Sequence, residues 1–276
     1  MAGGANRIGD VLLGAMAALD NGRPEQAESI ANQVLREERN HGRALYILGC
    51  ALLMQNRPAD AIVPLEAAAR GRHDPEFDTM MAIALRRVGQ NEDALRRLKL
   101  ATKRQPPYAV AFKELGHLLV SMQRYDEAVE ALKRGIEVAP MMPQLFVQLG
   151  YAYFSLRNFD DAKTTFSRAL DISPGSLDAL FGIARSHQEV GENAAAVDYF
   201  RRYLLARPSD DAAWLHLGHC LLELGQLEAG YDCFRTAARG DAKRYGSALS
   251  SLAAAARGRF WIRPSDAARF MRSTKN

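Results

Sequence analysis

The chain has 276 residues, of which 48% are hydrophobic and 25% charged, a composition typical of a folded, water-soluble protein and not of a disordered chain. Its formal net charge of +4 is small for this length, and the basic residues alternate with acidic ones, so we expect no nucleic-acid partner. We also expect a cytoplasmic protein without a membrane span, because no apolar run is long enough to cross a bilayer and the N-terminus lacks a secretory pattern.

The cysteines are Cys50, Cys220 and Cys233, an odd number that does not favour a disulfide framework. Two of them lie on apolar faces of expected helices. We therefore expect buried thiols and a reducing compartment.

Small residues recur at a nearly constant interval along the chain. The series is Ala27, Ala61, Ala94, Ala128, Ala162, Ala196 and Gly230, with intervals of 34, 33, 34, 34, 34 and 34 residues. A second small residue precedes each of these by 12 positions, and in six units a Leu or Phe follows by 4. An interval of this length is that of a stacked helix–turn–helix unit.

The intervals divide the chain into units that each contain two expected helices and a turn. Their ranges are 8–41, 42–74, 75–108, 109–142, 143–176, 177–210 and 211–241, after an N-terminal tail at 1–7. Gly, Asn and Asp mark most of the turns within units. Four successive units end at a proline: Pro106, Pro140, Pro174 and Pro208. Residues 242–276 break the pattern and predict a capping helix followed by a C-terminal tail.

The unit at 143–176 resembles the tetratricopeptide repeat family most clearly. It contains Phe146, Leu149, Gly150, Tyr153, Ala162, Phe166, Ala169 and Pro174, close to the pattern W-x2-L-G-x2-Y, A-x3-F-x2-A and P. The resemblance extends over roughly residues 8–241. It implies an all-α fold, a right-handed α-solenoid of about seven such repeats closed by a C-terminal capping helix.

In this family the first helix of each repeat lines a concave groove. Positions on one face of those helices predict partner-binding residues in this groove: Tyr46, Arg86, Lys113, His117, Tyr151, Phe154, Arg185 and His219. Aromatic and arginine side chains of this kind often anchor protein interfaces. Packing between neighbouring helices is the alternative reading of each position.

A carboxylate clamp, which some members of the family use to bind chaperones, is not expected here. Lys113 matches its first position, but His117 and Gln148 stand where asparagines are needed, and Asp178 and Gly182 where cations are needed.

Phe260, Trp261 and Ile262 lie close together in the C-terminal tail and predict either packing on the cap or a docking segment. The tail resembles the junction after the repeats in some bacterial sulfotransferase-like proteins. That resemblance implies an adapter, because the catalytic domain of those proteins is absent from this sequence.

The sequence offers little support for an enzyme. His216, His219 and Glu223 share one helical face and could hold a metal, but their spacing is generic and we favour a solvated helix face. We find no glycine-rich phosphate loop or nucleophile motif, so we expect no catalytic residues, no cofactor and no metal.

The expected function is therefore a non-catalytic scaffold or adapter that binds a partner peptide or helix in the concave groove. The alternative is a regulatory or substrate-recruiting subunit of a separate enzyme, for example a sulfotransferase-like or other transferase, docked through the aromatic tail. The identity of the partner and the oligomeric state do not follow from the sequence.

Overall fold

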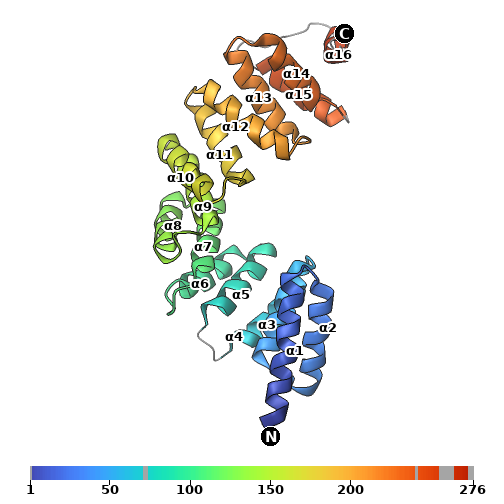
Figure 1. Ribbon diagram of the computed structural model, residues 1–276, viewed down its shortest axis with the longest axis vertical. Helices are drawn as coiled ribbons and strands as arrows, with labels where there is room; N and C mark the ends of the chain where they lie inside the picture. Colours follow the sequence, from blue (N-terminus) through green and yellow to red (C-terminus); the bar gives the residue numbers. More distant parts are fainter. Residues whose placement is uncertain (1, 71–73, 240–241, 255–263, 273–276) are drawn as a thin grey trace. The chain divides into compact units, whose positions relative to one another are not determined.

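The computed structural model describes residues 2–70, 74–239, 242–254 and 264–272, which form sixteen α-helices and contain no strand. Contacts divide the chain into an N-terminal unit, residues 1–140, and a C-terminal unit, residues 141–276. In each unit, helical hairpins follow one another along the chain (Figure 1). This is the all-α fold of helix–turn–helix repeats that the sequence predicts.

The N-terminal unit contains eight helices in four hairpins. They are α1 (Ala2–Asp20), α2 (Pro24–Glu37), α3 (Gly42–Met54), α4 (Pro58–Ala69), α5 (Pro75–Arg87), α6 (Asn91–Ala101), α7 (Ala109–Ser121) and α8 (Tyr125–Val138). Helix α1 begins at Ala2, so the segment that we expected as an N-terminal tail is helical from residue 2.

The C-terminal unit contains three further hairpins and two final helices. They are α9 (Pro143–Ser155), α10 (Phe159–Ile172), α11 (Leu177–Glu189), α12 (Asn193–Ala206), α13 (Asp211–Glu223), α14 (Leu227–Ala237), α15 (Ala242–Ala254) and α16 (Pro264–Arg272). We refer to the first helix of a hairpin as helix A and to the second as helix B.

Packing within each unit follows one rule. Helix A contacts helix B of its own hairpin, helix B contacts helix A of the next hairpin, and successive A helices also contact one another. Each hairpin therefore covers the apolar face that the preceding hairpin leaves open.

The repeated small residues form the closest contacts of these hairpins. Gly49, Gly116, Gly150 and Gly218 on A helices each pack against the Leu or Phe that stands 16 positions later, on helix B of the same hairpin. Those partners are Leu65, Leu132, Phe166 and Phe234, all fully buried. A Cβ at any of the four glycines would enter the space of that side chain, so a larger residue there would require the Leu or Phe to shift.

The turn between helices A and B has a left-handed residue at the same place in every hairpin. Gly22, Gly89, Gly191 and Gly225 occupy it in four hairpins, and Asn56, Gln123 and Arg157 in the other three, with φ between 58° and 84°. Glycine adopts this conformation without steric cost, whereas a residue with a Cβ does not. Gln123 is not one of the turn-forming types, Gly, Asn and Asp, on which the sequence prediction of the turns rests.

The end of the C-terminal unit is covered by α15, which packs against α13 and α14. Leu252 of α15 is fully buried in one cluster with Leu222 and Phe234. This is the expected capping helix. In α16, Phe270 lies edge-on to Tyr231 of α14, with ring centroids 5.2 Å apart, and the guanidinium of Arg235 lies 4.4 Å from the centre of the Phe270 ring.

Phe260, Trp261 and Ile262, the expected docking tail, lie outside the described residues. Within the described part of the chain, no helix has both the length and the apolar character needed to cross a membrane.

Candidate functional site

The expected binding residues lie on the A helices of both units. Tyr46, Arg86, Lys113 and His117 lie on α3, α5 and α7 of the N-terminal unit. Tyr151, Phe154, Arg185 and His219 lie on α9, α11 and α13 of the C-terminal unit. We describe the two A-helix faces separately.

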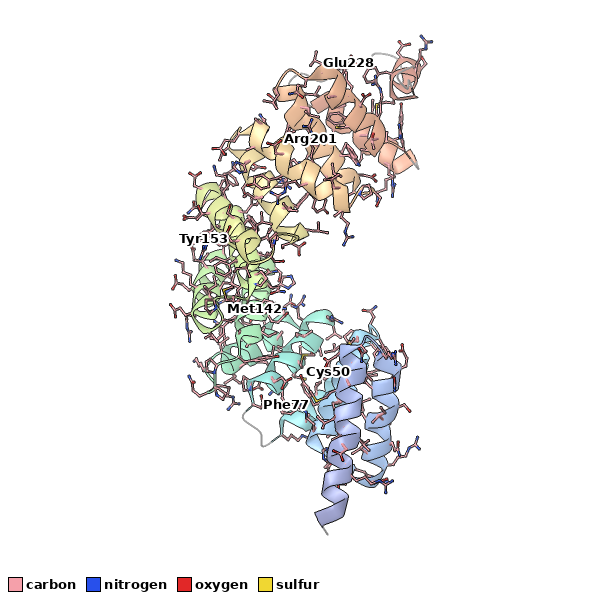
Figure 2. All side chains as sticks on the ribbon, in the orientation of Figure 1. Cys50, Phe77, Met142, Tyr153, Arg201 and Glu228 are labelled. Atoms are coloured by element: carbon pink, nitrogen blue, oxygen red, sulfur yellow. The ribbon has the colours of Figure 1, made fainter. Side chains whose placement is uncertain are left out.

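Tyr46 joins α3 to α5 and is not a free aromatic anchor. Its hydroxyl donates a hydrogen bond of 2.6 Å to Glu76 Oε1, and its ring lies edge-on to Phe77, with centroids 4.7 Å apart. Only 6% of the residue is exposed. Burial, followed by the neighbouring Cys50, raises the pKa of the Tyr46 hydroxyl, which therefore stays protonated. Figure 2 labels Cys50 on α3 and Phe77 on α5, two helices in contact.

Arg43 and Glu76 form the more accessible part of this contact. The Arg43 guanidinium lies 5.5 Å from the centre of the Tyr46 ring and 3.7 Å from the Glu76 carboxylate. Their side chains are 37% and 30% exposed, so a ligand can reach both. Arg43 and Glu76 share the expected face but are not among the eight predicted binding residues.

Three basic groups surround one buried carboxylate between α5 and α7. Glu114 is 8% exposed, with Lys113 Nζ 2.9 Å from its Oε1 and Arg86 Nη2 3.5 Å from its Oε2. Burial, and then the charge of Arg86, lower the pKa of His117 beside this group. With His117 neutral, two cations share one carboxylate, and the cluster is net positive.

This cluster also has unused hydrogen-bonding capacity. Arg86 Nε and Glu114 Oε2 are buried atoms without a hydrogen-bond partner among the described residues. A buried polar atom without a partner destabilises the protein, because it has lost its hydrogen bonds to water.

The matching face of the C-terminal unit is built around Phe154 and Arg185. The Arg185 guanidinium lies 5.2 Å from the centre of the Phe154 ring, and its Nη2 lies 3.4 Å from Glu189 Oε1. Tyr151 donates a hydrogen bond of 3.2 Å to the carbonyl of Asp178, and burial raises its pKa to about 12. Arg185 and Phe154 thus form a partly exposed cation–aromatic pair that links α9 and α11.

The two histidines of α13 face aromatic rings. His216 stacks on Phe200 with ring centroids 5.6 Å apart, and His219 lies edge-on to Phe234 at 5.2 Å. Burial is the main cause of a lowered pKa at both residues. It lowers the pKa of His216 to about 4 and also lowers the pKa of His219. The described residues contain no group of three or more His, Cys, Asp or Glu side chains that could hold a metal ion.

All three cysteines are buried free thiols, and burial raises the pKa of each to about 12. Such protonated, inaccessible thiols are poor nucleophiles. Gly182, which stands at a cation position of the carboxylate clamp, packs against the ring of Phe166 and leaves no room for a basic side chain.

Comparison with known families gives the identity of the repeats. The family model for the tetratricopeptide repeat matches residues 12–76, 113–176 and 181–244, more than half of the chain. The chain belongs to the tetratricopeptide repeat family. No curated protein sequence matches it.

Solved structures of tetratricopeptide repeat proteins share the fold. A structure titled for functional characterisation of pilF from Pseudomonas aeruginosa is 17% identical, with a TM-score of 0.66, over 76% of this chain and 96% of the other. A tetratricopeptide repeat protein from Parabacteroides merdae is 18% identical, with a TM-score of 0.63, over 88% of this chain and 98% of the other. MamA from Desulfovibrio magneticus is 22% identical, with a TM-score of 0.54, over 61% of this chain and 97% of the other. At these identities the likeness shows the fold alone.

Proposed function

We propose that the protein is a non-catalytic scaffold or adapter that binds a partner peptide or helix on its A-helix faces. The observation that carries the proposal is the recurrence of partly exposed basic groups among aromatic or charged neighbours on both faces. In the N-terminal unit these basic groups are Arg43, beside Glu76, and the pair Lys113 and Arg86. In the C-terminal unit the basic group is Arg185, which lies on the Phe154 ring. Stacked helical repeats commonly use such surfaces for extended partners.

The chemistry of these groups indicates what they bind. Arginine and lysine donate hydrogen bonds, so they favour carboxylates and main-chain carbonyl groups of a partner. Phe154 offers apolar area beside Arg185, which suits a segment that places an apolar side chain next to an acidic or carbonyl group. The buried Tyr46 and the partly buried His216 and Tyr151 hold the A helices in place and contribute indirectly.

Photo-crosslinking tests the proposal directly. A photoreactive phenylalanine analogue at Phe154 would capture a partner at the C-terminal face, and the same analogue at Leu205, an exposed residue of helix B α12, is the matched control. We expect specific protein adducts from position 154 and none of the same mass from position 205. Identical adducts from both positions, or none from 154, would contradict the proposal.

No observation on the described residues supports the alternative function, a regulatory or substrate-recruiting subunit that docks on an enzyme through Phe260, Trp261 and Ile262. The described part of the tail that follows residues 260–262, helix α16, contacts α14 of the same chain. Replacing Phe260, Trp261 and Ile262 by serine leaves partner binding unchanged if the A-helix faces bind, and abolishes it if the tail docks.

A further inference from the structure

Two exposed leucines of the C-terminal unit lie beside unpaired carboxylates at the turn between α13 and α14. Leu224 and Leu227 flank this turn and are 40% and 41% exposed. Glu223 ends α13, Glu228 lies in the first turn of α14, and both are exposed. Neither glutamate forms an ion pair with another described residue. These four residues form an apolar, negatively charged surface that we call the turn patch.

The last turns of α12 carry an exposed leucine among basic residues. Leu205 is 86% exposed, the most exposed large apolar side chain in the described part of the chain. Arg201 and Arg202 precede it by four and three residues, Arg207 follows it by two, and all three are exposed. None of these arginines forms an ion pair with a described carboxylate. Asp198, also exposed, stands one turn earlier and leaves this surface, the arginine patch of Arg201, Arg202, Leu205 and Arg207, net positive.

The two patches of one chain lie too far apart to cover each other. The turn patch lies where α13 ends and α14 begins, whereas the arginine patch lies towards the other end of the hairpins. Asn193 begins α12 at the repeat position of Leu227, and Leu205 stands twelve residues further on, about 18 Å along the helix axis. Figure 2 labels one residue of each patch, Arg201 on α12 and Glu228 on α14. Each chain therefore presents both patches at once.

Charge and apolar character make the two patches complementary. The turn patch offers two leucines and two carboxylates, and the arginine patch offers one leucine and three guanidinium groups. Covering the exposed leucines supplies affinity, and the pairing of opposite charges orients the approach. Each patch carries the groups that the other lacks, and both belong to the same chain. A second copy of this chain is therefore a partner that fits both surfaces.

We propose that copies of this chain associate through these surfaces, with the turn patch of one copy on the arginine patch of the next. The exposed leucines pack together, and the arginines pair with the glutamates. The contact joins two different surfaces, so each copy can bind a neighbour on either side and association continues beyond a dimer. It centres on few side chains and on exposed charges, so it is weak and decreases with salt. The expected binding residues on the A-helix faces take no part in it.

Sedimentation velocity of the purified full chain, over a range of protein concentrations, tests this association. One variant, Glu223→Arg/Glu228→Arg, reverses the turn patch, and a second, Arg201→Glu/Arg202→Glu, reverses the arginine patch. A third variant carries all four substitutions, which makes the patches opposite in charge again.

The control is Arg96→Glu/Arg168→Glu, which changes the net charge as the second variant does, at exposed B-helix positions outside both patches. Circular dichroism first establishes that every variant keeps its helical content. Wild type is also measured at about 1 M salt, where the screening length is about 3 Å.

We expect wild type and the control to associate reversibly as the protein concentration rises, and wild type to associate less at high salt. Each single-patch variant should lower the association constant at least about tenfold, and the four-residue variant should recover it. Wild type that stays monomeric at every concentration would assign the patches to another partner and overturn the proposal. So would association that either single-patch variant retains, or a four-residue variant that does not recover it.

The photoreactive analogue at Leu205 gives a second readout on the purified protein. We expect an adduct with the mass of two chains, whose crosslinked peptide contains the turn patch of the neighbour. This mass differs from that of an adduct with another protein, so position 205 still serves as the control for position 154. A two-chain adduct that maps away from the turn patch would contradict the proposed contact, and partner binding on the A-helix faces does not depend on the result.

Discussion

Phe166 of α10 packs against Gly182 of α11, so closely that glycine alone fits opposite its ring. The same ring contacts Gly150 of α9, where an added Cβ would lie 2.7 Å from Cε1. Phe166 is fully buried and thus joins three helices of two successive hairpins.

Gly182→Ala is therefore expected to destabilise the protein by about 1–3 kcal/mol, because the buried ring must shift to admit the methyl group. Gly175→Ala is the control, since nothing lies within 4 Å of its Cβ position. Urea denaturation followed by circular dichroism measures both. Equal midpoints for the two variants would show that the ring moves aside freely.

The left-handed turn position predicts opposite effects in two hairpins. Gly191 has φ of 77°, so Gly191→Ala should cost about 1 kcal/mol. Gln123 has φ of 60° with a side chain present, so Gln123→Gly should be neutral or stabilising by up to about 1 kcal/mol. Thermal unfolding of both variants checks the signs. Destabilisation by Gln123→Gly would mean that its side chain makes a compensating contact.

The repeat interval predicts the hairpins and the buried small and large residues that recur in them. A small residue is needed where two helices approach closely, and a large one fills the groove beside it. Ala94 and Leu98, for example, are buried as expected. The partners of individual polar side chains were not predictable. Tyr46 of α3 donates a hydrogen bond to Glu76 of α5, a contact between two successive A helices that residue spacing does not report.

Asp78 is expected to be the most sensitive acidic residue of the N-terminal unit. It is 3% exposed and lies 3.2 Å from both Arg97 Nη1 and Arg104 Nη2. Asp78→Asn would leave two cations without their carboxylate, at a cost of about 2–4 kcal/mol. Asp171→Asn, which breaks an exposed pair with Arg168, should cost less than about 1 kcal/mol. Comparable denaturation midpoints for these variants would contradict this account.

His216 makes stability depend on pH. Its folded-state pKa of about 4 lies below the ordinary value of 6.5, so the unfolded chain binds the proton more tightly. Stability from this residue is complete above about pH 6.5 and falls as the pH drops towards 4, by no more than about 1.4 kcal/mol per pH unit. Urea denaturation at about pH 7 and pH 5 should show the decrease. His216→Phe should make it smaller, and an unchanged pH dependence would show that His216 is solvated.

Charge reversal on the A-helix faces tests whether a partner binds there. The measurement is affinity capture from native lysate with quantitative mass spectrometry, comparing wild type, Lys113→Glu/Arg185→Glu and the control Arg96→Glu/Arg168→Glu. Circular dichroism first establishes that each variant keeps its helical content. We expect a partner that is recovered by wild type and by the control and lost from Lys113→Glu/Arg185→Glu. Equal recovery by all three proteins would contradict binding on the A-helix faces.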